Sequence, residues 1–291
     1  MKKIYLLLAL CFTMHVAYAQ EPVADSVKES EPEKCEGNNP ITFNLSVGLG
    51  STSVANHFIS AHEYNYVTYG FHLDFGRFYK PWKNVSWNLA FDYNPATLHN
   101  SAQTSSISYT ALSLNYSSSY NWQFGKGFMV KVGGGLDVSG DMITNLTDIT
   151  NNAVSLNGLA QLEASIGASY TFKFKTWMLG FSGNISTPFA GLVLTDAKHE
   201  TGADSWASNS LIKHHASHFK LTSFSNMQGV DYDITVKFVA PRVAISLGVT
   251  SENRWWYIND IQNRRKNIMF RIGAGFDLVS LKQTKTINRY F

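Results

Sequence analysis

The chain has 291 residues, of which 44% are hydrophobic and 15% charged, and this composition excludes an intrinsically disordered protein. The formal net charge is +3 at pH 7, and two of the lysines lie in a segment that we expect to be removed. A nearly neutral chain lacks the electrostatic footprint of a nucleic-acid-binding protein, so nucleic-acid partners are excluded.

Residues 1–19 have the pattern of a secretory signal peptide. Two lysines precede an apolar stretch over 4–16, and an A-x-A cleavage site ends at Ala19. The alternative is a lipoprotein signal with Cys11 as the lipid anchor, but Leu10 stands where a small residue is needed. Cleavage after Ala19 leaves Cys35 as the single thiol, which excludes an intramolecular disulfide and a paired-cysteine metal site.

The segment that follows, 20–40, is acidic and rich in proline. It carries few apolar residues, so we predict a disordered periplasmic leader, with contact to a partner as an alternative role. From residue 41 the hydrophobic period changes to two. We predict a β-barrel domain over 41–282 and a C-terminal tail over 283–291.

Ten stretches alternate apolar and polar residues, which is the pattern of strands with one apolar face. In the first, Phe43, Leu45, Val47 and Leu49 alternate with polar residues and glycine. The others cover 67–75, 85–93, 112–122, 128–138, 160–172, 177–185, 232–238, 243–249 and 268–278. Each is long enough to cross a membrane obliquely.

The composition of the two faces distinguishes a membrane barrel from a soluble sandwich, which would show the same period. The polar faces use many glycines and few charges, unlike a water-exposed sheet, and the apolar faces carry no charge. Aromatic residues near the short turns are typical of an interfacial girdle. The predicted girdle residues are Trp82, Trp87, Trp122, Phe124, Phe128, Phe172, Phe174 and Trp177.

The predicted fold is therefore all-β, a transmembrane antiparallel up-and-down β-barrel of about ten strands in the outer membrane of a Gram-negative bacterium. Short connections at 125–127, 173–176 and 239–242 alternate with longer segments at 50–66, 94–108, 139–155, 186–231 and 250–267. Such barrels have short periplasmic turns, so we expect the longer segments to be extracellular loops. A further hairpin around 188–194 and 219–224 would raise the count to twelve, and eight strands is the lower bound.

Three segments carry a resemblance to a known group of proteins: STPFAG at 186–191, ISLGVTSENRWWYIND at 245–260 and IMFRIGAGFDL at 268–278. Together with the alternating strands, they resemble the uncharacterised small outer-membrane barrel proteins of the Bacteroidota. The resemblance implies a barrel fold and an outer-membrane location, and it implies no activity.

Charged residues on the polar strand faces define a predicted network in the lumen. Its members are His72, Asp74, Asp92, Lys131, Asp137, Glu163, Asp233, Lys237, Arg271 and Asp277. In a narrow barrel these groups pair across the lumen and form a polar plug. Arg271 is the expected central partner, because its planar fork binds two carboxylates. The excess of acids over bases favours, as an alternative, a narrow path for cations.

Seven of the histidines fall in the expected extracellular loops, including His99. The sequence H-H-x-x-H places His214 and His218 on one face if the segment is helical, which would suit zinc. The possible surface site for zinc or haem comprises His199, Glu200, His214, His215 and His218. The alternative is that these residues are polar loop filler, and no cofactor is required by the fold.

No catalytic residue can be assigned, because the chain contains no G-x-S-x-G or comparable signature. We therefore predict a structural, binding or accessory role at the cell surface. Aromatic residues at Trp206 and at 255–257 form either a contact surface or an outer girdle. The expected partners are outer-membrane lipid and another outer-membrane or periplasmic protein. The alternatives are a narrow channel or small-solute transporter and a lipid-modifying hydrolase.

Overall fold

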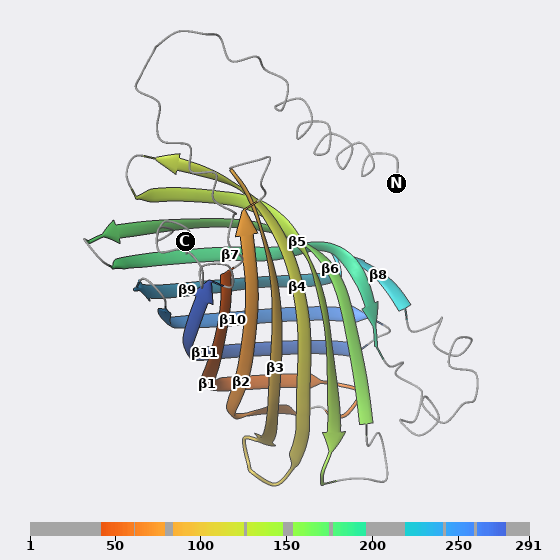
Figure 1. Ribbon diagram of the computed structural model, residues 1–291. Helices are drawn as coiled ribbons and strands as arrows, with labels where there is room; N and C mark the ends of the chain where they lie inside the picture. Colours follow the sequence, from red (N-terminus) through yellow and green to blue (C-terminus); the bar gives the residue numbers. More distant parts are fainter. Residues whose placement is uncertain are drawn as a thin grey trace, which may run out of the picture. The chain divides into compact units, whose positions relative to one another are not determined.

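The computed structural model describes residues 42–60, 62–78, 84–124, 127–147, 154–174, 177–195, 219–240, 243–258 and 261–277. The predicted signal peptide, leader and C-terminal tail lie outside these ranges. Eleven strands occupy the described part of the chain (Figure 1). They are β1 (Thr42–Asn56), β2 (Glu63–Phe78), β3 (Val85–Asn100), β4 (Ser106–Phe124), β5 (Phe128–Asn145), β6 (Val154–Lys173), β7 (Met178–Leu194), β8 (Phe219–Ser223), β9 (Met227–Val239), β10 (Ala244–Ile258) and β11 (Ile261–Asp277).

All strands except β8 form one closed antiparallel circuit. Each strand of the circuit pairs with its neighbours along the chain, β7 pairs directly with β9, and β11 returns to β1. The closing pair runs in unbroken register from Thr42 opposite Asp277 to Asn56 opposite Asn263. A closed circuit leaves no unpaired sheet edge, which is the condition for strands to cross lipid. The predicted up-and-down barrel of ten strands is confirmed.

The long segment 186–231 does not add a hairpin to the circuit. Residues 186–194 extend β7, and β8 pairs with the end of β7, with Leu194 opposite Phe219. The next strand, β9, pairs with the first part of β7 up to Ser186 opposite Asp231. β8 and β9 therefore pair with different parts of the same edge of β7. A turn at 224–226 connects β8 to β9. The twelve-strand alternative fails for this reason.

An apolar belt surrounds the barrel on its outer surface. Its side chains are large and exposed, with Leu247 57% and Phe270 66% accessible. A contiguous exposed band of this kind is typical of a surface that contacts lipid. The belt includes Leu45, Val47, Leu49, Val67, Phe71, Phe91, Leu112, Leu114, Leu136, Val138, Leu162, Ile166, Ile185, Ile234, Ile245, Leu247, Ile268, Phe270 and Ile272. In the described ranges no helix has the length and hydropathy needed to span a membrane.

The aromatic side chains near the short turns contact one another in a band. Phe174 stacks on Trp177 with ring centroids 3.7 Å apart, and Trp177 lies 5.1 Å from Phe238. Phe124 and Phe128 meet across the β4–β5 turn at 6.0 Å. The end of the barrel that carries the β2–β3, β4–β5, β6–β7 and β9–β10 connections is called the short-turn end below. Trp82 lies outside the described residues.

The strands continue well beyond the apolar belt at the opposite end, which is called the long-loop end below. The segments expected as loops at 50–66 and 250–267 are mostly strand, because β1 extends to Asn56 and β10 and β11 form a hairpin across 244–277. The expectation was wrong because the apolar alternation ends before the backbone pairing does. Outward positions such as Ser53 and Lys266 are polar although backbone pairing continues through them. His99 accordingly lies in β3 and not in a loop.

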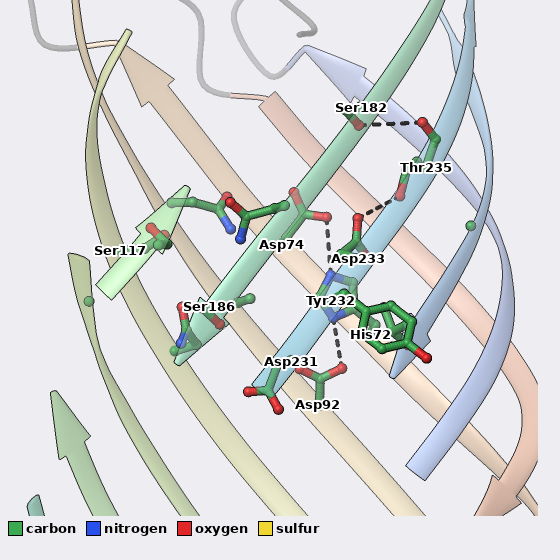
Figure 2. A pocket seen from close by; sticks show the side chains of 18 of the residues that line it. His72, Asp74, Asp92, Ser117, Ser182, Ser186, Asp231, Tyr232, Asp233 and Thr235 are labelled. Atoms are coloured by element: carbon green, nitrogen blue, oxygen red, sulfur yellow. Dashed lines mark hydrogen bonds and ion pairs between the residues drawn. The ribbon is translucent and has the colours of Figure 1, made fainter. Parts of the chain in front are cut away.

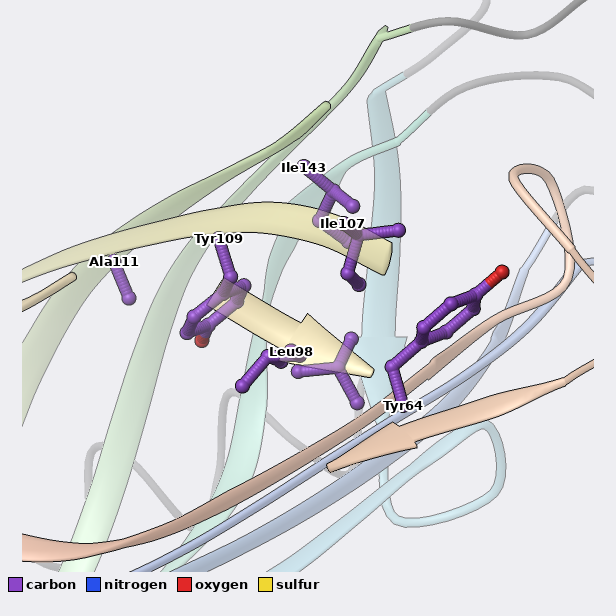
Figure 3. Close-up of a cluster of buried hydrophobic side chains, with 7 residues drawn as sticks. Tyr64, Leu98, Ile107, Tyr109, Ala111 and Ile143 are labelled. Carbon is purple, nitrogen blue, oxygen red and sulfur yellow. The ribbon is translucent and has the colours of Figure 1, made fainter. Parts of the chain in front are cut away.

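Inward positions near the long-loop end are filled by apolar side chains. Figure 3 shows Ile107, Tyr109 and Ala111 of β4 close to Leu98, Tyr64 and Ile143. Opposite strands contribute a second cluster of Leu159, Val193, Met227, Trp256 and Ile258. Since the outward residues at this level are polar, the apolar side chains gather in the interior and form an ordinary hydrophobic core. Trp256 is 2% exposed, so it belongs to this core and not to a surface contact site.

Candidate functional site

The lumen contains a polar cavity of about 490 Å³ (Figure 2). It extends from Thr42, Gly76 and Ser86 at the short-turn end to Glu252 and Arg254 towards the long-loop end. Nine of the residues predicted for the lumen network line it: His72, Asp74, Asp92, Lys131, Asp137, Glu163, Asp233, Lys237 and Arg271. Asp277 is the last residue of β11 and pairs with Thr42, and its side chain lies outside the description.

His72 is held between two carboxylates. Its Nδ1 lies 2.7 Å from Oδ1 of Asp92, and its Nε2 lies 3.4 Å from Oδ2 of Asp74 (Figure 2). The carboxylates have further donors, since Asn44 donates to Asp74 at 2.8 Å and Ser113 to Asp92 at 3.4 Å. A general base needs a free ring nitrogen towards its nucleophile. With both nitrogens facing carboxylates, His72 is arranged to bridge β2 and β3 and not to activate a serine.

Arg271 has a smaller role than the sequence predicted. Its Nη2 donates to Oδ2 of Asp233. The other carboxylate oxygen, Oδ1, accepts a hydrogen bond from Thr235 at 2.8 Å. The side chains of Arg271 and Asp233 are 13% and 34% exposed, so solvent screens this pair. The bridging of several carboxylates, expected of Arg271, is carried out by two other arginines.

Arg254 crosses the lumen from β10 to β6 and β9. Its Nη1 donates to Oε1 of Gln161 at 2.7 Å, and its Nη2 donates to Glu163 at 2.5 Å and also to Asp231. The Arg254 side chain is only 3% exposed. Its Nε forms no hydrogen bond with a described residue but lies 3.7 Å from Oε1 of Glu252. Buried charges of this kind are stable only while their hydrogen-bonded partners are present.

A second arginine continues this layer. Arg265 of β11 lies 3.4 Å from Asp141 of β5 and donates to Glu252 of β10. Asp141 is held in place by Asn157, which donates to it at 2.9 Å and accepts from Thr195 at 2.9 Å. We call the set of Arg254, Arg265 and their carboxylate and amide partners the arginine layer. It joins β5, β6, β9, β10 and β11 across the interior.

Sequence reasoning missed the arginine layer because Arg254 and Arg265 fall in segments taken as loops. A signal was available. Glu252 and Arg254 share the parity of the inward residues Ser246 and Gly248, and Arg265 shares that of Arg271. Following the two-residue period past the last apolar position would have placed both arginines in the lumen.

The predicted surface zinc or haem site cannot be located, because His199, Glu200, His214, His215 and His218 lie outside the described residues. Within the described part of the chain, no group of three His, Cys, Asp or Glu side chains is arranged to hold a metal ion. His99 makes a ring contact with Tyr66 at 5.1 Å.

The closed circuit, the apolar belt and the polar interior define the class of this protein: a β-barrel with the fold of outer-membrane proteins. Over residues 5–285 the chain matches the family described as protein of unknown function (DUF3316), and it belongs to that family. No curated protein sequence matches the chain significantly.

Several solved outer-membrane structures are similar to this chain. The outer membrane protease OmpT from Escherichia coli has 8% identity and a TM-score of 0.48, with 86% of this chain and 100% of that chain covered. The translocator domain of the autotransporter NalP from Neisseria meningitidis has 8% identity and a TM-score of 0.36, with 94% and 98% covered. An outer membrane channel from Pseudomonas putida F1 has 9% identity and a TM-score of 0.37, with 86% and 100% covered. Identities this low transfer no activity.

Proposed function

We propose that this protein is an integral outer-membrane barrel that is closed to passage and binds a small polar ligand from the periplasmic side. The membrane location is supported by the apolar belt and the aromatic band, which match the surface of a transmembrane barrel. With the predicted periplasmic leader, the short-turn end faces the periplasm. The affiliation with the Bacteroidota remains part of this proposal, carried by the sequence resemblance.

The arginine layer is the observation that carries the proposal. Its guanidinium groups and most of their partners are almost without solvent contact, with Arg254 3% and Arg265 4% exposed. The apolar clusters around Leu98 and Trp256 fill the interior near the same end. A solute crossing this level would have to separate buried charges, and each unpaired charge carries a large desolvation cost.

The cavity supports a binding role. Its volume of about 490 Å³ lies in the range of small-molecule sites, and the residues that line it are mainly polar. It reaches the short-turn end at Thr42 and Gly76, whereas the arginine layer ends it in the other direction. The protein would therefore act as a membrane-anchored binding or accessory component, in contact with lipid and with a periplasmic or outer-membrane partner.

The second candidate is a narrow channel, which the polar lining of the cavity favours. In this case the arginine layer would be the barrier that moves. The hydrolase alternative has no supporting observation among the described residues, because the lumenal histidine has carboxylates at both ring nitrogens.

Two measurements test the proposal. Heated and unheated protein from outer-membrane fractions should differ in mobility on a detergent gel, as a folded barrel does. The same folded protein in planar bilayers should show no discrete conductance, because the arginine layer and the apolar clusters both close the interior. Discrete conductance by the wild-type protein would refute the closed barrel and establish the channel. A band in the soluble periplasm that does not shift on heating would refute the membrane location.

A further inference from the structure

Two lysines in the cavity differ from Arg254 and Arg271, which line the same cavity and form ion pairs. Lys131 of β5 and Lys237 of β9 both line the cavity, yet in the described part of the chain neither lies in an ion pair. Arg254, Arg265 and Arg271 each have at least one carboxylate partner. Both lysine side chains are partly exposed, so their ammonium groups are available to an anion that enters the cavity.

The two lysines line the same cavity from β5 and β9, which are not neighbours in the circuit. Asp74 lines this cavity too but forms no ion pair with either lysine, because its Oδ2 accepts from Asn44 at 2.8 Å and lies 3.4 Å from His72. An anion that bound in the cavity would face two positive groups without a carboxylate partner.

The positions around the lysines leave space for such an anion. Lys131 pairs across the sheet with Gly167 on one side and Asn121 on the other, and Lys237 pairs with Gly180 and Ser246. The two glycines and the serine carry little or no side chain into the lumen beside the lysines. Ser46, which lines the same cavity and is 4% exposed, has a hydroxyl group without a hydrogen-bond partner. The cavity therefore contains two lysine ammonium groups without an ion pair among the described residues and one serine hydroxyl group without a hydrogen-bond partner.

We propose that Lys131 and Lys237 bind the oxyanion group of a small ligand, a phosphate or a carboxylate, that enters from the short-turn end. This proposal rests on the binding function proposed above and adds the chemical class of the ligand. Lysine acts as a point charge on a flexible stem, so the site selects for negative charge more than for the shape of the anion. The layer around Arg254 lies beyond the site and prevents onward passage.

The test uses the full mature chain, folded in a zwitterionic detergent, with inorganic phosphate and acetate as probes. Calorimetric titration should detect saturable binding of at least one probe by the wild-type protein. Lys131→Met and Lys237→Met should each weaken binding at least about tenfold, since each removes one charge-assisted hydrogen bond. Lys131→Arg should retain binding. Lys266→Met is the matched control, because Lys266 is exposed on the outside of β11 and should not affect binding.

Folding is checked by heat-modifiable mobility, and only variants that shift on the gel are compared. Saturable binding that both methionine variants lose and Lys131→Arg retains supports the site. Absence of binding for both probes, or equal binding by the double methionine variant, overturns it. Vesicles containing phosphatidylglycerol form a second arm: if they compete with the soluble probe, the oxyanion belongs to a lipid headgroup, and if they do not, it belongs to a free solute.

The two proposals can fail separately. If the wild-type protein conducts in bilayers but the lysines still bind phosphate, the closed barrel is refuted and the anion site stands. If the protein is silent in bilayers and binds neither probe, the anion site is refuted and the closed barrel stands.

Discussion

Substitution of Arg254 should destabilise the barrel more than substitution of Arg271. Arg254→Met keeps a flexible unbranched side chain and removes three donated bonds, of which two go to carboxylates. Glu163 is 5% exposed and would remain as a buried charge without its cation. Removing one partner of a buried pair costs about 3–5 kcal/mol, and we expect a loss of stability in this range.

The comparison variant is Arg271→Met. The Arg271–Asp233 pair is 13% and 34% exposed, so its loss should cost only about 1 kcal/mol. Both variants can be measured by urea unfolding in lipid vesicles, with tryptophan fluorescence as the signal and Lys266→Met as the control. Adding Glu163→Gln to Arg254→Met should recover part of the loss, because the uncompensated charge is removed with it.

Equal unfolding midpoints for Arg254→Met and Arg271→Met would refute the reasoning. That result would mean that the arginine layer is hydrated and that burial does not determine how much the layer contributes to the free energy of unfolding. Failure of Glu163→Gln to recover any stability would equally contradict the assignment of the loss to a buried carboxylate.

Three further predictions follow from the fold. Leu247→Arg places a charge on the apolar belt and should lower the free energy of unfolding in vesicles by about 2–4 kcal/mol. Ser53→Arg, beyond the belt, should leave this free energy almost unchanged. Similar losses for the two variants would contradict the assigned belt. Gly50→Val should abolish the heat-modifiable band, since a Cβ there lies 1.9 Å from a backbone oxygen of β11, whereas Gly140→Ala, with 3.4 Å to its nearest atom, should keep it. His72→Leu leaves two carboxylates without their shared partner and should lower the free energy of unfolding in urea by about 1–3 kcal/mol. An unchanged free energy of unfolding would exclude the bridge.

Local pattern predicted the strands and the outer surface well. The alternation of Leu45, Val47 and Leu49 with small polar residues depends only on lipid outside and a polar lumen inside, so it is readable from neighbouring positions. The same reasoning placed His72 and Asp74 on an inward face, and both line the cavity. It failed at the ends of strands, where the apolar belt has ended and both faces change composition. Residues 50–56 and 250–258 were therefore taken as loops.

The sequence by itself determined that the chain forms a barrel with an apolar outer face and a polar inner face, because each strand carries that information in a period of two residues. Only the tertiary structure decided which charges meet in the lumen. Arg254 and Glu163 are 91 positions apart in the chain, and Arg265 and Asp141 are 124 apart. Their pairing depends on the closure and register of the whole circuit, as does the isolation of Lys131 and Lys237 from any carboxylate partner among the described residues.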